Sequence, residues 1–61
     1  MENQKTILQS IYRFSTQEHE VYIRGRLIAK TCDGSNAILL ASYYLAAKGI
    51  FDYGINHNSV E

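Results

Sequence analysis

The chain of 61 residues contains no proline, and Cys32 is its one cysteine. A single thiol cannot close an internal disulfide, and no Cys-X-X-Cys pair or cluster of cysteine with histidine provides the ligands of a zinc site. We therefore expect one small domain, residues 1–61, near the lower size limit at which a single hydrophobic core can hold a fold. A lone thiol without disulfides also favours a reducing compartment.

The chain also lacks net charge, because six Lys and Arg residues balance six Asp and Glu residues. No overall field attracts it to nucleic acid or to an anionic membrane, so an electrostatic function requires local segregation of charge. The longest uncharged stretch, 34–47, is too short to cross a bilayer, and the first residues show no signal-peptide pattern. We expect a cytoplasmic protein without a membrane partner, located in the host cytoplasm if it is viral.

Catalytic, metal-binding and cofactor motifs are missing as well. Cys32 precedes a predicted helix, where a thiolate is stabilised, but no residue marks a base for it. The segment "EHE", 18–20, is interpreted as the polar tip of a hairpin, and "DGSN", 33–36, lacks the glycines and the lysine of a phosphate loop. The sequence therefore predicts no enzyme, no metal and no cofactor.

Alternating side chains predict a half-buried strand over residues 20–31. One side of this strand carries Val21, Ile23, Gly25, Leu27 and Ala29, and the other carries Tyr22, Arg24, Arg26, Ile28 and Lys30. Residues 5–14 are rich in β-branched and aromatic side chains, which favours a first strand joined by a polar hairpin loop. The same residues also fit a helical stripe, so both structures remain open.

A helix follows over residues 36–48. Asp33 or Ser35 can cap its first turn, Lys48 suits the negative end of its dipole, and Gly49 can adopt the left-handed conformation that ends it. Alternation from Phe51 to Asn56 then predicts a third strand.

These elements predict an α+β fold of the order ββαβ, with loose ends at 1–4 and 58–61. A crossover helix would place the last strand beside the first, giving a three-stranded antiparallel sheet of order 2-1-3 with the helix on one face. Gly25 either lies under the helix or marks a β-bulge. The expected inner residues are Leu8, Tyr12, Phe14, Val21, Ile23, Leu27, Phe51, Tyr53 and Ile55 on the sheet, and Ala37, Ile38, Leu40, Ala41, Tyr44 and Leu45 on the helix.

The face of this sheet without a helix would hold four of the six basic residues. Its expected members are Ile7, Ile11, Arg13, Tyr22, Arg24, Arg26, Ile28 and Lys30. We predict that Arg13, Tyr22, Arg24, Arg26 and Lys30 contact a partner, since arginine pairs with carboxylates in a bidentate manner and tyrosine adds rigid contact area. The alternative is a solvated face on which long basic stems cover the aliphatic side chains.

The helix supplies a second candidate surface, because 34–47 contains no charged residue. Its outer side carries Leu39 and Tyr43, where an ordinary surface helix carries charge. We predict self-association as a homodimer through Leu39 and Tyr43, because a two-fold contact uses one patch twice and enlarges a small core. The alternative is that both side chains are singly exposed without consequence.

The order of two strands, one helix and a final strand in about sixty residues resembles small phage-encoded proteins that inhibit host enzymes or act as antitoxins. The resemblance implies a small protein that binds and inhibits or modulates a host protein, here one with an acidic surface that meets the basic sheet face. A nucleic-acid-binding regulator that uses the same face is the second choice. A third interpretation is a subunit that completes a larger assembly through its edge strand.

Overall fold

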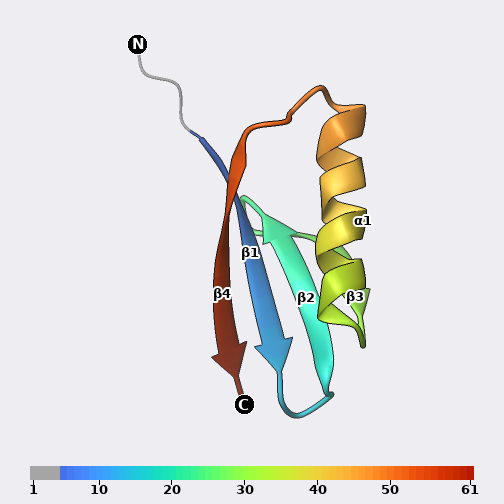
Figure 1. The fold of residues 1–61 in the computed structure, drawn as a ribbon. Helices are drawn as coiled ribbons and strands as arrows, with labels where there is room; N and C mark the ends of the chain where they lie inside the picture. The colour runs from blue at the N-terminus through green and yellow to red at the C-terminus, as the bar shows by residue number, and fades with distance from the viewer. Residues whose placement is uncertain (1–4) are drawn as a thin grey trace.

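The computed structural model describes residues 5–61, which form four strands and one helix (Figure 1). In chain order they are β1 (Thr6–Arg13), β2 (Glu18–Ile23), β3 (Arg26–Thr31), α1 (Gly34–Ala47) and β4 (Tyr53–Val60). The prediction of a loose end at 1–4 lies outside the described residues. The prediction of a loose end at 58–61 is wrong, because residues 58–60 belong to β4.

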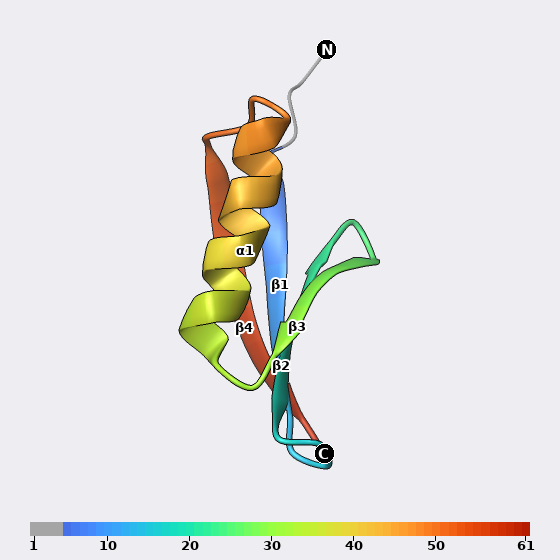
Figure 2. The same ribbon diagram turned by 90° about the vertical axis from the view of Figure 1, so that its right-hand side faces the viewer.

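The strands form one mixed sheet in the order β3-β2-β1-β4, with α1 on one face (Figures 1 and 2). Neighbours β1 and β2, and β2 and β3, are antiparallel, whereas β1 and β4 are parallel, from Thr6 opposite Tyr53 to Arg13 opposite Val60. The predicted α+β class is confirmed. The predicted sheet of three antiparallel strands is wrong, because there are four strands and one parallel pair.

A turn at Arg24 and Gly25 causes this difference. Both residues have positive φ, 53° and 80°, the combination that a two-residue hairpin turn requires. Residues 20–31 therefore form two strands instead of one, and the extra strand reverses the direction in which the chain enters α1. As a consequence β4 returns parallel to β1. A Cβ added to Gly25 would meet no atom within 4 Å, so this glycine serves the turn and does not lie under the helix.

The first strand is confirmed against its helical alternative. Thr6, Leu8 and Ser10 are buried on the face of β1 that α1 covers, and the intervening residues are more exposed. Residues 14–17 then form a tight loop, in which the amide of Gln17 donates to the carbonyl of Arg13 at 2.8 Å. Gln17 has a φ of 57°, a left-handed conformation that polar turn residues tolerate.

Both predicted ends of the helix are confirmed. The Asp33 carboxylate accepts a hydrogen bond from the amide of Ser35 at 2.9 Å, which satisfies one of the free donors of the first turn. At the other end Gly49 has a φ of 77° and donates to the carbonyl of Ala46, while Ile50 donates to the carbonyl of Leu45. This pattern of two bonds closes the last turn and directs the chain toward β4.

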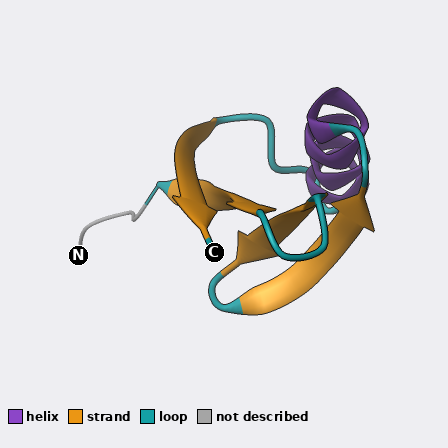
Figure 3. Cartoon of the chain, turned by 90° about the horizontal axis from the view of Figure 1, so that it is seen from below, coloured by secondary structure: helices purple, strands orange, loops and turns teal. Residues whose placement is uncertain are grey.

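The core lies between α1 and the half of the sheet formed by β2 and β3. The helix packs against β3 and β2 and touches β1 less, and its backbone stays away from that of β4, from which only Tyr53 packs against the core (Figures 2 and 3). The buried apolar residues are Leu8, Val21, Ile23, Ala29, Ala37, Ala41 and Leu45. Three of these are alanines, so the core is small even for a chain of this length.

Five predicted core residues are exposed instead: Phe14, Leu27, Leu40, Phe51 and Ile55. The prediction placed the helix over the middle of a three-stranded sheet. In the structure the helix sits over the β2–β3 hairpin, which leaves the helix-side face of β4 uncovered. No helix within residues 5–61 has the length and apolar character needed to cross a bilayer.

Candidate binding site

The predicted basic face is interrupted by acidic residues. Nε and Nη2 of Arg13 donate to the two oxygens of the Glu20 carboxylate, both at 3.1 Å, and the Tyr22 hydroxyl donates to the same carboxylate at 2.9 Å. The Glu20 side chain is only 8% exposed. The hydrogen bonds from Arg13 and then Tyr22 hold the pKa of Glu20 below its usual value of 4.5, and the bond to Glu20 raises the pKa of Arg13.

Lys30 is paired in the same way. Its ammonium lies 3.5 Å from the Glu18 carboxylate, and Lys30 is the cross-strand neighbour of Glu20. Arg13, Tyr22 and Lys30 therefore share the sheet face away from α1, as predicted, but two carboxylates lie among them. Because the positive charges there are matched by negative ones, this face offers little attraction to an acidic partner.

Arg24 and Arg26 do not lie on that face, which corrects the prediction for both. Arg24 occupies the hairpin turn, and Arg26 pairs with the buried Ile23, so it belongs to the side that α1 covers. The register shifts where Val21 pairs with Ala29 but Tyr22 pairs with Leu27, which leaves Ile28 without a partner. Ile28 packs against the core instead of standing on the outer face. The hairpin turn and this bulge break the simple alternation that the prediction used.

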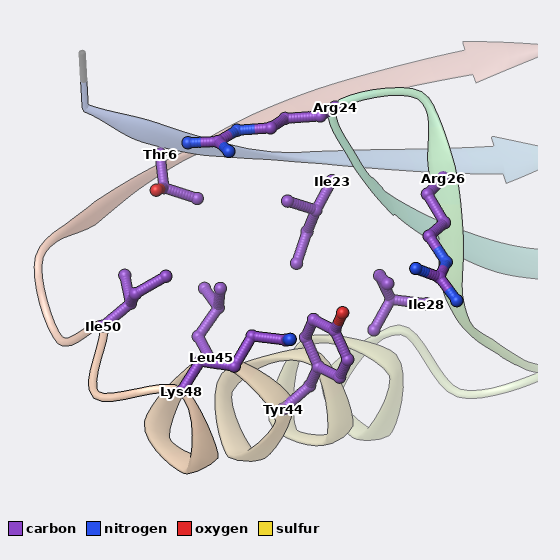
Figure 4. Close-up of a pocket in the computed structure, with 9 residues that line it drawn as sticks. All are labelled: Thr6, Ile23, Arg24, Arg26, Ile28, Tyr44, Leu45, Lys48 and Ile50. Carbon is purple, nitrogen blue, oxygen red and sulfur yellow. The ribbon is translucent and has the colours of Figure 1, made fainter.

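The two arginines instead border a pocket between the hairpin turn and the C-terminal half of α1 (Figure 4). The pocket has a volume of about 310 Å³. We call it the basic pocket and define it by its lining residues, Thr6, Ile23, Arg24, Arg26, Ile28, Tyr44, Leu45, Lys48 and Ile50. Three of these are cations and none is a carboxylate.

The cations of the basic pocket are those without a carboxylate partner. Within residues 5–61 the ion pairs are Lys5 with Asp52, Arg13 with Glu20 and Lys30 with Glu18. The three remaining basic residues of the chain, Arg24, Arg26 and Lys48, all line the basic pocket. Three of the six basic side chains are thus paired with carboxylates, and the other three line the basic pocket.

Two local contacts hold the groups at the helix end of the basic pocket in position. Tyr44 and Lys48 are one helical turn apart, and the Lys48 ammonium lies 5.1 Å from the centre of the Tyr44 ring, within range of a cation–π contact. The hydrogen bond from Ile50 to the carbonyl of Leu45 fixes the end of the pocket nearest β4. Figure 4 shows Ile23, Ile28 and Leu45 between the arginines and the helix, so the interior is aliphatic. The arrangement combines an apolar interior with a positive rim.

The sequence prediction included Arg24 and Arg26 among the candidates, though on another face, and it did not include Lys48, which it interpreted only as a residue suited to the helix end. Lys48 does sit at that end, as the C-cap of α1. A turn at Arg24 and Gly25 would have been the signal, since a hairpin there places the two arginines at one end of the sheet.

The predicted surface for self-association is exposed. Leu39 and Tyr43 point away from the core, and Leu40, predicted to be buried, is exposed beside them. Ser42 donates its hydroxyl to the carbonyl of Leu39 at 2.7 Å. The outer side of α1 is therefore apolar and uncharged, and association through it stays a prediction.

No catalytic constellation is found in the described part of the chain. Cys32 is exposed, and within residues 5–61 no three His, Cys, Asp or Glu side chains gather as ligands for a metal ion. His19 stacks at 4.7 Å on Tyr12, which in turn meets Phe14 edge to face at 4.8 Å. These rings form a small aromatic group under the start of α1.

Comparison with known proteins gave no match, whether with family models, curated proteins or solved structures. The basic pocket is therefore the feature from which a function can be inferred.

Proposed function

We propose that the protein is a non-enzymatic binding protein that inhibits or modulates a protein partner by docking an acidic segment at the basic pocket. The observation that carries the proposal is the gathering of Arg24, Arg26 and Lys48, which have no carboxylate partner within residues 5–61, around one apolar hollow. The predicted partner, a protein with an acidic surface, is retained, but the contact moves from the sheet face to the helix side of the hairpin.

Charge supports this choice of partner. The chain as a whole is neutral, so attraction over long distances is weak, and the positive rim acts only at short range. Guanidinium groups bind carboxylates in a bidentate geometry, and two of them from adjacent sides of a turn can hold one acidic group each. The carboxylates of a partner would neutralise these three cations and replace the water that hydrates them.

The aliphatic interior supports a protein partner in particular. Ile23 and Leu45 are buried and Ile28 and Ile50 partly so, and together they make a surface on which an apolar side chain can be shielded from water. Interfaces draw most of their binding energy from a few such anchors set in pockets and surrounded by polar contacts. A segment that offers one large apolar side chain between acidic neighbours fits both parts of the site.

The nucleic-acid alternative receives less support. It relied on Tyr22 as a stacking platform among basic residues, but the Tyr22 hydroxyl donates to Glu20, and that carboxylate would repel a phosphate backbone beside the ring. The resemblance to phage inhibitors rested on an order of elements that lacks β3. Neither point is needed for the proposal, which depends on the pocket alone.

The test uses fluorescent peptides as probes. We expect a nonapeptide of Glu and Asp with a central Phe to bind, and R24Q/R26Q to weaken that binding by about tenfold or more, since each charged hydrogen bond contributes on the order of 1.5–3 kcal/mol before solvent screening. The matched control compares single variants: R26Q should weaken binding, whereas K30Q, which removes the same charge on the other face of the sheet, should retain it. Equal loss in the two variants, or no binding by the parent protein, would refute the proposal.

The same titration separates the alternatives. A single-stranded oligonucleotide that binds better than the acidic peptide, with affinity falling steeply as salt is added, would favour the nucleic-acid regulator. Affinity capture with the parent protein, R24Q/R26Q and K30Q as baits would then identify the partner, which should be retained by the parent and by K30Q only.

A further inference from the structure

β4 is an edge strand with one side unoccupied within the described chain. It pairs with β1 along its whole length, and no other element of residues 5–61 lies beyond it (Figure 3). The helix leaves it uncovered, and its residues from Ile55 to Val60 are exposed. A row of backbone amide and carbonyl groups is therefore open to another strand.

This edge has none of the features that usually protect such strands. β4 contains no proline, lysine, arginine, aspartate or glutamate, and its eight pairs with β1 run without a bulge. The opposite edge, β3, is different, because it carries Arg26 and Lys30, a register shift lies in its pairing with β2, and α1 packs against it. One edge of the sheet is protected and the other is open.

Exposed apolar groups stand at both ends of β4. Phe51, two residues before the strand, is 78% exposed, although large aromatic side chains are usually covered. At the far end Phe14 is 55% exposed, and its amide donates to the carbonyl of Val60 at 2.9 Å. Beside Phe14 lies a shallow hollow of about 400 Å³, lined by Phe14, Ser15 and Glu61. An unshielded ring and an apolar hollow thus lie at opposite ends of one strand.

We propose that β4 pairs antiparallel with β4 of a second copy about a two-fold axis, with Asn56 opposite Asn56. In an antiparallel pair the start of one strand meets the end of the other, so the ring at one end reaches the hollow at the other end, twice. Parallel pairing would instead bring the two Phe51 rings together at one end and the two hollows together at the other, so neither ring would meet a hollow.

The register follows from the same groups. Opposite residues of an antiparallel pair lie on one face, so pairing Asn56 with itself keeps both helices on one side of a continuous sheet of eight strands. This register sets Phe51 of one copy opposite Glu61 of the other, at the hollow lined by that residue. Ile55 then faces His57. No like charges oppose each other, and Asp52 near the end is already paired with Lys5 at 3.5 Å.

A second copy fits this edge because the strand is complementary to itself. The two-fold contact needs no other partner, because each copy supplies both the ring and the hollow. It also adds apolar contacts to a small core, which holds seven buried apolar side chains among residues 5–61. No residue of β4 lines the basic pocket, although Ile50, which does line it, precedes Phe51.

Sedimentation equilibrium over a range of concentrations tests the proposal. The parent protein should dimerise, F51S should weaken the dimer about 100-fold because two rings lose their cover, and N56K about fivefold because two lysines face each other. Both positions are exposed, so circular dichroism should show an unchanged fold. Mixing N56K with N56E should give a heterodimer at least about fivefold tighter than either variant forms with itself.

N36K is the matched control, since it places the same side chain on the outer side of α1. Dissociation by N36K but not by N56K would assign the dimer to the helix and overturn the proposal. A parent protein that stays monomeric would overturn it too, and so would F51S with the affinity of the parent.

Discussion

Shortening Leu45 to alanine should remove a large part of the free energy of unfolding. Leu45 is 1% exposed and is among the largest fully buried side chains of the described residues. Replacements of this kind cost about 2–5 kcal/mol, depending on how far the cavity collapses. Because Leu45 also lines the open basic pocket, water can enter the space, which places the expected cost near the lower end, about 2–3 kcal/mol.

That cost is large for this chain. At about 0.05–0.15 kcal/mol per residue, a domain of 61 residues has a total stability of about 3–9 kcal/mol. L45A should therefore lower the melting temperature by about 10–20 °C. Thermal unfolding followed by circular dichroism measures this shift, at one protein concentration for all variants, because dimerisation would couple to stability.

Leu40 provides the control, since the sequence predicted it to be buried with Leu45. It lies in the same helix and undergoes the same chemical change, but it is 51% exposed, so L40A should cost no more than about 0.5 kcal/mol. Equal costs for L40A and L45A would mean that α1 packs with a different side toward the sheet, and the described core would be refuted.

Two other changes test local features. G25A should destabilise the protein by about 1 kcal/mol, because alanine resists the φ of 80° although no atom obstructs its side chain; an unchanged melting temperature would contradict the turn. The lowered pKa of Glu20 means that its pairing with Arg13 and Tyr22 stabilises the fold above pH 4.5, and that this stabilisation is lost as pH falls through the folded pKa. In a plot of the urea midpoint of unfolding against pH, E20Q should reduce the slope over this acidic range. A slope equal to that of the parent protein would contradict the assignment.

Local signals in the sequence were sufficient for the elements that local chemistry determines. The caps at Asp33 and Gly49 marked both ends of the helix, whereas the β-branched run of β1 favoured a strand without excluding a helix. These features depend on residues a few positions apart, and neither needs knowledge of the rest of the fold.

Most of the errors in the predicted topology come from one dipeptide. Arg24 and Gly25 fit the alternation of a continuous strand, and an arginine in a left-handed conformation is uncommon enough that the alternation appeared the simpler interpretation. Because the prediction missed this turn, it was wrong about the direction of β4, about the placement of the helix over the sheet and about the face on which the two arginines lie. The basic pocket could not be predicted for the same reason, because its residues come from β1, the hairpin and α1 and meet only once that turn is formed.

The parallel pairing of β1 with β4 also bears on the order in which the chain folds. The two hairpins that join β1, β2 and β3 close short loops, whereas Thr6 meets Tyr53 only across nearly the whole chain. The entropy of closing that loop favours forming the three antiparallel strands first, with the helix next and β4 last. During synthesis β1 would present a bare edge until residues 53–60 emerge. Docking of β4 should therefore be the slowest step of folding, and its amides the first to exchange hydrogen with solvent.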